Sequence, residues 1–140
     1  MTKKQAPSDQ LTDEDYQTLA AIRAALRRFM HFSEDAAKGA GLTPQQHQAL
    51  LAIRAAPEKV LSIGELADLL LIQPHTASEL ADRLGILGLV ERRPGAKDRR
   101  MMKLHLTSAA EKALQALSVT HKAELRRLRP LLDALLCRLE

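Results

Sequence analysis

Apolar residues in the first third of the chain recur at spacings of three and four, which is the period of one helix face. Thr12 precedes this stripe and is followed by three acidic residues, which suit the positive end of a helix dipole. Gly39 and Gly41 end the helix or loosen its last turn. The apolar stripe consists of Tyr16, Leu19, Ile22, Leu26, Phe29 and Met30.

Three shorter helices follow, and each begins with a recognisable start signal. Thr43 is a typical N-cap residue, with a proline and two glutamines directly behind it. Ser62 and Glu65 have the spacing of a second capping box, which opens a short helix. Pro74 fits best as the first residue of a third helix that reaches about Leu87, because a proline is tolerated in the first helical turn.

The pattern changes after Gly88. Residues 89–92 are a candidate for a short strand, and residues 94–98 are typical of a turn. Apolar and polar side chains alternate over residues 102–106, which is the period of a half-buried strand. Together these segments predict a β-hairpin, which is too small to be stable alone and must pack on the preceding helices.

The C-terminal part is predicted to be helical from Thr107 onward. Pro130 should kink this helix or divide it in two. The apolar seam could be an intramolecular core stripe, but one subunit of this size offers few partners, so we favour a dimer seam shared with the first helix. The seam repeats at steps of three and four and consists of Leu114, Leu117, His121, Leu125, Leu128, Leu132, Leu135 and Leu139. We interpret His121, its one polar member, as a satisfied or partly exposed side chain; a sensing role is the alternative.

Charge is concentrated in the hairpin. Residues 92–103 contain six basic residues and one acid, which is a net charge of +5, whereas all 140 residues together carry +4. A charged turn is common on protein surfaces, but one that follows a pair of short helices favours an anionic partner. Aromatic residues make up only 2% of the chain, which argues against single-stranded nucleic acid, because its binding relies on aromatic stacking.

Other classes of function find little support. The single cysteine, Cys137, excludes an intramolecular disulfide and a thiolate metal cluster. The five histidines lack ligand spacing, so we predict no metal and no cofactor, although a site built from distant residues stays open. No catalytic constellation is visible, so we do not expect an enzyme. No leader and no apolar run of transmembrane length is present, which predicts a cytoplasmic protein without a membrane partner.

The predicted order of elements is mainly α with a small β-hairpin wing, that is, a winged helix-turn-helix with N- and C-terminal dimerisation helices. The second helix of such a pair is narrow enough to enter the major groove of duplex DNA. A basic wing beside it contacts phosphates or the minor groove, where arginine gains from the enhanced negative potential. We expect a flexible arm (1–10), an N-terminal helix contributing to dimerisation (11–41), a DNA-binding domain (42–107) and C-terminal dimerisation helices (108–140).

Several fragments, in this order and spacing, resemble the MarR family of bacterial transcriptional regulators over roughly residues 11–128. The resemblance implies a homodimer that binds a pseudo-palindromic DNA operator, usually to repress, and that is released by a small lipophilic or phenolic effector or by oxidation. Cys137 is interpreted as an interface thiol rather than a redox sensor, because the family's sensing cysteines lie near the N-terminus. The fragments are residues 42–46, 63–67, 80–84, 88–92, 98–100 and 106–107.

The resemblance also assigns residues. Asp98 is expected to orient Arg100, which would enter the minor groove. The positions expected to contact DNA from the recognition helix are Gln73, His75, Thr76, Ser78, Glu79 and Arg83, and those from the wing are Arg93, Lys97, Asp98, Arg99 and Arg100. An effector pocket would be lined by Phe29, Phe32, Leu50 and Ile53.

Three residues depart from the family pattern. Leu71 stands where a turn glycine is common, so a more helical turn is expected. Gly85 weakens the recognition helix by roughly 0.5–1 kcal/mol relative to alanine. Glu79 would repel phosphate, and could instead accept from cytosine N4 or pair with a nearby arginine. Together with Asp82, it supports an alternative function, a winged-helix protein-interaction module with weak or no specific DNA binding.

Overall fold

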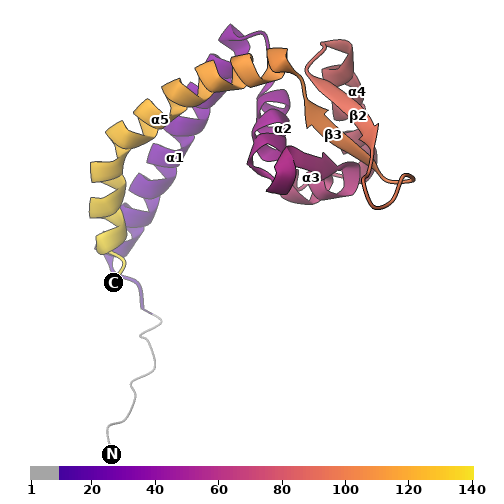
Figure 1. Ribbon diagram of the computed structural model, residues 1–140. Helices are drawn as coiled ribbons and strands as arrows, with labels where there is room; N and C mark the ends of the chain where they lie inside the picture. The colour runs from indigo at the N-terminus through magenta and orange to yellow at the C-terminus, as the bar shows by residue number, and fades with distance from the viewer. Residues whose placement is uncertain (1–9) are drawn as a thin grey trace, which may run out of the picture. The chain divides into compact units, whose positions relative to one another are not determined.

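The computed structural model describes residues 10–140 (Figure 1), so the predicted arm lies outside the described residues except for residue 10. Within this range the fold is mainly helical with a small antiparallel sheet, which confirms the predicted fold class. The elements are α1 (Asp13–Gly39), α2 (Pro44–Ala55), η1 (Pro57–Lys59), β1 (Val60–Ser62), α3 (Ile63–Leu70), α4 (Pro74–Ile86), β2 (Val90–Pro94), β3 (Met102–Leu106) and α5 (Ser108–Cys137). None of the helices in residues 10–140 is long and apolar enough to cross a membrane.

The predicted start signals determine where the central helices begin. The Thr43 hydroxyl accepts from the Gln46 backbone N–H at 3.1 Å, and the Gln46 side chain accepts from the Thr43 N–H at 3.0 Å. Ser62 and Glu65 form the same reciprocal pair at the start of α3, both bonds at 3.1 Å. Pro74 is the first residue of α4, as predicted. Each capping box satisfies two backbone donors that a helix start would leave without partners.

The hairpin belongs to a sheet that the sequence analysis did not predict in full. β3 lies in the middle, with β2 on one side and the three-residue β1 on the other. β1 places Val60 opposite His105, and β2 places Val90 opposite Leu106. Ser62 is both the last residue of β1 and the N-cap of α3. The wing strands are therefore tied directly to the start of α3.

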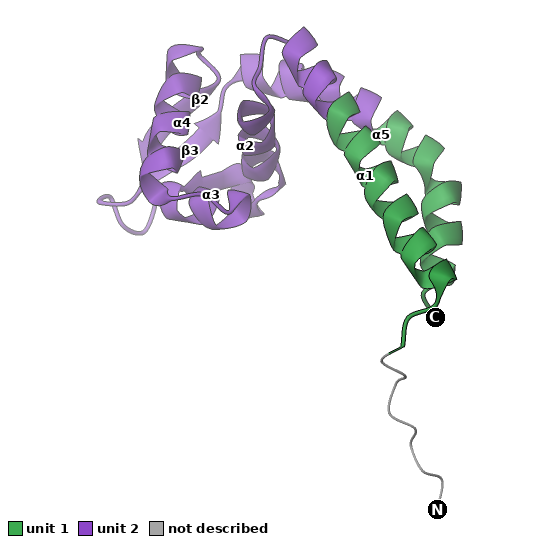
Figure 2. Cartoon of the chain, turned by 180° about the vertical axis from the view of Figure 1, so that it is seen from behind, with its two compact units in different colours: residues 1–32, 122–140 green, residues 33–121 purple. Residues whose placement is uncertain are grey.

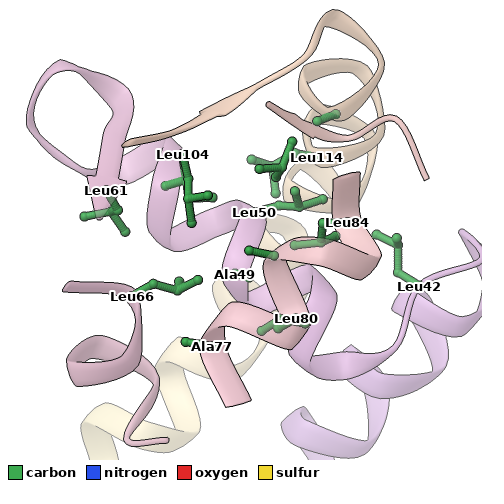
Figure 3. Close-up of a cluster of buried hydrophobic side chains, with 14 of the residues drawn as sticks. Leu42, Ala49, Leu50, Leu61, Leu66, Ala77, Leu80, Leu84, Leu104 and Leu114 are labelled. Atoms are coloured by element: carbon green, nitrogen blue, oxygen red, sulfur yellow. The ribbon is translucent and has the colours of Figure 1, made fainter. Parts of the chain in front are cut away.

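The core of residues 33–121 is aliphatic and joins α2, α3, α4, β1, β3 and the first part of α5 (Figure 3). Leu50, Leu66, Leu84 and Leu104 contribute large side chains with at most 1% of their surface exposed. Because α3 and α4 both insert leucines into this cluster, their relative position is fixed by packing rather than by the short turn between them.

The chain divides into two compact units (Figure 2): residues 33–121, and residues 1–32 together with 122–140. In the second unit, Ala25 and Thr18 of α1 and Leu128 and Leu135 of α5 are buried. α5 continues as one helix across Pro130. Of the two outcomes predicted for this proline, a kink or a division of the helix, division therefore does not occur. Large apolar side chains of this unit stay at least two-fifths exposed: Leu11, Tyr16, Leu19, Leu26, Met30, Leu125, Leu131, Leu136 and Leu139.

The turn between α3 and α4 corrects the expectation of a more helical backbone. Leu71 caps α3 in the left-handed conformation, with φ 57° and ψ 42°, as a glycine would. We expect Leu71→Gly to raise the free energy of unfolding by up to about 1 kcal/mol, because the left-handed strain of an L-residue disappears. Little burial is lost, since Leu71 is 92% exposed. Chemical denaturation measures the change.

The matched control is Leu69→Gly, an exposed leucine inside α3. This substitution should lower the free energy of unfolding by about 1 kcal/mol, because glycine is unfavourable within a helix. A loss of stability in both variants would show that the Leu71 backbone is not strained.

Candidate nucleic-acid interface

Helix α4 presents most of the predicted contact residues on its outer side. Ala77, Leu80, Ala81 and Leu84 form its buried face, as expected from their spacing. The remaining positions of the helix therefore point away from the core. Gln73, His75, Glu79 and Arg83 are exposed, and Thr76 and Ser78 are partly buried.

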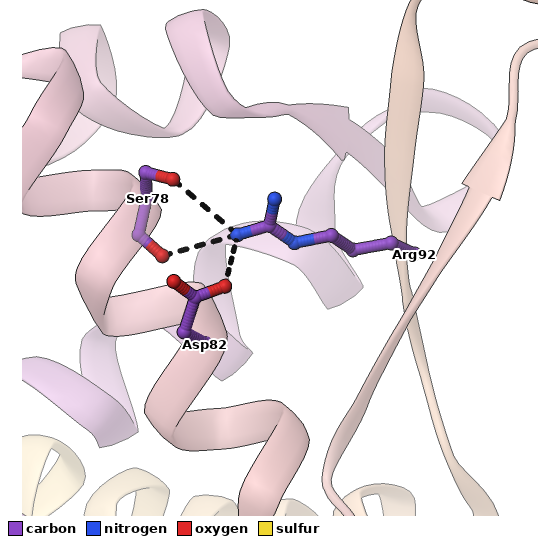
Figure 4. A network of polar contacts seen from close by, with 3 residues as sticks. All are labelled: Ser78, Asp82 and Arg92. Carbon is purple, nitrogen blue, oxygen red and sulfur yellow. Dashed lines mark hydrogen bonds and ion pairs between the residues drawn. The ribbon is translucent and has the colours of Figure 1, made fainter.

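Ser78 is engaged by an arginine that the sequence analysis did not single out. One terminal nitrogen of Arg92 donates to the Asp82 carboxylate at 2.6 Å, to the Ser78 backbone carbonyl at 3.1 Å and to the Ser78 hydroxyl at 3.4 Å (Figure 4). Arg92 lies on β2, whereas Ser78 and Asp82 lie one turn apart on α4. The network thus clamps the wing to α4, and it engages the Ser78 hydroxyl and the Asp82 carboxylate.

The tip of the wing is a tight loop held by its own backbone. The Gly95 N–H donates to the Met101 carbonyl at 2.8 Å, and the Met101 N–H donates to the Asp98 carbonyl at 3.1 Å. A Cβ on Gly95 would lie 2.8 Å from that Asp98 carbonyl oxygen, so glycine is needed here. The Asp98 carboxylate accepts from the Arg100 backbone N–H at 2.9 Å. Asp98 therefore holds the backbone of Arg100 at the tip of the wing.

The basic residues of the hairpin fall into two groups. Those on the strands each meet an acid: Arg92 meets Asp82 at 2.6 Å, Arg93 meets Glu91 at 2.6 Å, and Lys103 meets Glu65 at 2.9 Å. Those at the tip, Lys97, Arg99 and Arg100, are exposed, and no residue within 10–140 forms an ion pair with them. The uncompensated positive charge of the hairpin is therefore concentrated at the loop.

The first turn of α2 borders the same surface. A hollow of about 360 Å³ is lined by the N-cap and first turn of α2 (residues 43–46) and by Thr76, Glu79, Leu80 and Arg83 of α4. Thr76, Glu79 and Arg83 were predicted from the sequence to contact DNA, whereas Leu80 and the α2 turn were not. Glu79 is exposed, and in the part of the chain that the structure describes no arginine pairs with it; Asp82 makes the ion pair instead.

Glu65 connects the wing to the start of α3. Its hydrogen bond with Lys103, followed by those with the backbone and side chain of Ser62, lowers its pKa to about 2. Because the pKa is lower in the folded chain, the stabilisation is complete above the unfolded pKa near 4.5 and is lost as pH falls toward about 2. We expect Glu65→Gln, which can keep the capping bond, to show a smaller loss of stability between pH 4.5 and pH 2. Thermal unfolding across this range measures it.

Lys103→Met tests the same ion pair from the other side and should also reduce the acid-dependent loss. A Glu65→Gln variant whose stability falls with acid as steeply as that of the unmodified chain would contradict the role of this carboxylate.

His47 and His121 lie together, with ring centroids 4.8 Å apart. His121 is satisfied, as interpreted from the sequence: Nδ1 lies 2.7 Å from the Leu117 carbonyl and Nε2 lies 2.8 Å from the Ser33 hydroxyl. His47 is only 2% exposed, and burial, followed by the nearby His121, lowers its pKa. His47 therefore favours the neutral form in the folded chain.

The four residues predicted to line an effector pocket fall into two separate pairs. Leu50 and Ile53 have no exposed surface and belong to the hydrophobic core. Phe29 and Phe32 stack on each other in the other unit, with ring centroids 6.5 Å apart. The pocket itself stays a prediction, and Leu50 and Ile53 have a structural role that the sequence analysis did not give them.

Comparison with known proteins is consistent with this arrangement. Residues 40–101 match the model of the MarR family. No significant match was found among curated proteins.

Solved structures give the same fold. AbsC, a MarR family transcriptional regulator from Streptomyces coelicolor, is 22% identical, with 86% of this chain and 81% of AbsC covered and a TM-score of 0.71. MarR from E. coli is 21% identical, with 84% of this chain and 93% of MarR covered and a TM-score of 0.66. A mutant MepR from S. aureus bound to an oligodeoxyribonucleotide is 20% identical, with 94% of this chain and 100% of MepR covered and a TM-score of 0.69. Residues 40–101 are therefore similar to the MarR family, in line with the resemblance seen in the sequence, and the chain has the fold of the solved MarR family structures.

Proposed function

We propose that the chain is a transcriptional regulator that binds a specific sequence of double-stranded DNA as a homodimer and represses transcription in the cytoplasm. Helix α4 would enter the major groove, with Gln73, His75, Thr76, Glu79 and Arg83 toward the DNA. The wing would lie on the neighbouring minor groove. A relative with the same fold binds an oligodeoxyribonucleotide, which supports this assignment.

The observation that carries the proposal is the division of the basic residues in the hairpin. The cations on the strands are neutralised by acids, whereas Lys97, Arg99 and Arg100 project from a loop that is held rigid by Gly95 and Asp98. Three unpaired cations on a narrow, ordered loop suit a polyanion with closely spaced phosphates. Arg93, also expected at the interface, would have to leave Glu91 before it could contact DNA.

The dimer is inferred from the apolar surface of the unit formed by residues 1–32 and 122–140. Tyr16, Leu26 and Met30 of α1 and Leu125 and Leu136 of α5 are each 46–60% exposed. Several large apolar side chains exposed on one small unit are typical of an interaction site. A second copy is the partner we propose, because two-fold pairing would place two α4 helices on successive turns of a palindromic operator.

Selection from a random duplex library tests the function. We expect enrichment of an inverted repeat whose half-sites lie about 10 base pairs apart, one turn of DNA. Sedimentation of the chain alone should give twice the monomer mass, and Leu136→Glu should shift it toward the monomer. Enrichment of no sequence would contradict the proposal, and enrichment of a single half-site by a monomer would contradict its dimeric part.

The alternative, a protein-interaction module, relied on exposed acids along α4. Asp82 is engaged by Arg92, which leaves Glu79 as the remaining support. From the family resemblance, we also propose that a small lipophilic or phenolic effector releases the chain from DNA. Such an effector should lower the affinity of the chain for the operator obtained from the library selection.

A further inference from the structure

A second hollow, with a mostly apolar lining, lies between α2 and α3. It has a volume of about 650 Å³ and is bounded by the C-terminal half of α2, the start of η1, β1 and α3. Leu51, Ala52 and Ala55 line it from α2, and Leu69 and Leu70 line it from α3. All of these residues lie within the unit of residues 33–121. A hollow of this size holds a small organic molecule.

The lining is apolar but not neutral. Leu51 is 42% exposed and Leu69 is 61% exposed, so two large aliphatic side chains face solvent across the hollow. The polar side chains that line it are Gln48, Glu65 and Asp68, and no basic residue contributes to its wall. An apolar site bordered by carboxylates attracts a cation and repels a carboxylate or phenolate.

The two carboxylates are not equivalent. Glu65 is held by Lys103 at 2.9 Å and by the Ser62 backbone N–H at 3.1 Å, so its charge is already compensated. Asp68 is exposed, and within residues 10–140 it forms no ion pair. Asp68 lies near the end of α3, beside Leu69 at the border of the apolar wall.

We propose that this hollow binds a small amphipathic amine, with its apolar body between α2 and α3 and its ammonium group at Asp68. The charge of the site disfavours ligands that are anionic at neutral pH, such as carboxylates. A primary amine with a pKa near that of lysine is protonated at neutral pH and fits the single uncompensated carboxylate.

The backbone on both sides of α3 explains how such a ligand would act. Within the described chain, the residues other than glycine with positive φ are Glu58, Lys59 and Leu71. The first two precede β1, and the third ends α3, so they bracket the segment that forms one wall of the hollow. Strained residues of this kind can absorb a shift of the element between them. Occupancy would displace α3 and, through their shared packing, α4; this regulatory step rests on the proposed function.

Calorimetry on the full chain, without DNA, tests the site with three probes of equal apolar body: phenylbutylamine, phenylbutanol and phenylbutyrate. The amine should bind about fivefold more tightly than the alcohol, and the carboxylate more weakly than either. Asp68→Asn should raise the Kd of the amine about fivefold and leave that of the alcohol unchanged. Ala55→Phe, at an exposed position of the wall, should abolish binding of both; circular dichroism confirms its fold.

Asp133→Asn, which removes a carboxylate of α5 outside the hollow, is the control and should change none of the three affinities. The proposal is overturned if phenylbutyrate binds as tightly as the amine, if Asp68→Asn keeps the preference for the amine, or if none of the probes binds.

A second arm measures operator affinity by fluorescence anisotropy. Phenylbutylamine should weaken operator binding by the unmodified chain and should do so less for Asp68→Asn. Unchanged operator affinity in a chain that binds the amine would overturn the coupling through α3. A chain that binds the amine but no DNA would instead refute the proposed function and leave the site intact.

Discussion

Replacing Arg100 with alanine should lower operator affinity by about 1–3 kcal/mol, which is roughly five- to 150-fold, and should reduce its dependence on salt. The guanidinium stands on a loop whose backbone is fixed by Asp98 and Gly95, so only its side chain has to be ordered on binding DNA. Removing one phosphate or minor-groove contact should decrease the slope of log affinity against log salt by about one. Anisotropy titrations at several salt concentrations measure both quantities.

Lys112→Ala is the matched control, because it removes one exposed positive charge from α5, outside the helix-turn-helix and the wing. Its affinity and salt slope should stay close to those of the unmodified chain. If Arg100→Ala behaves like this control, the wing tip is not part of the binding surface.

Replacing Leu50 with alanine should lower the free energy of unfolding by about 2–5 kcal/mol. Leu50 has no exposed surface and lies among leucines of α3, α4 and β3 (Figure 3), so truncation leaves a cavity that its neighbours can fill only in part. Such a loss is a large fraction of the total stability of a typical domain, about 5–15 kcal/mol. Urea denaturation with a two-state fit measures it.

The neighbouring Leu51→Ala is the control. Leu51 is 42% exposed, so its truncation should have a clearly smaller effect on stability. The comparison also separates the two roles considered for Leu50. A small loss of stability together with a weakened effector response would favour the pocket, whereas a large loss would show that the residue supports the fold.

Helix boundaries were predictable because the signals that set them are local. Thr43 and Ser62 each have their capping partner three residues along the chain. Pro74 lacks a backbone N–H, which is tolerated in the first turn of a helix because that N–H would have no partner within the helix. The outer face of α4 followed from the spacing of its four buried residues. These features need no information about distant parts of the chain.

Features that depend on distant partners were missed. β1 is three residues long, too short to show an alternating pattern, and it exists because β3 offers it a free edge. The clamp of Arg92 on Ser78 and Asp82 joins positions that only the folded hairpin brings together. The left-handed backbone at Leu71 is imposed by the packing of α3 and α4, which overrides the local preference of leucine.

The clamp between Arg92 and α4 has a consequence for how an operator would be chosen. Its hydrogen bonds, 2.6–3.4 Å long, join β2 to α4, so the loop and the helix keep a fixed separation. The helix and the loop can therefore contact only two DNA segments that lie a fixed distance apart. Inserting one base pair between these segments rotates one relative to the other by about a tenth of a turn. A chain with an intact clamp should reject such an insertion, and one without Arg92 should tolerate it better.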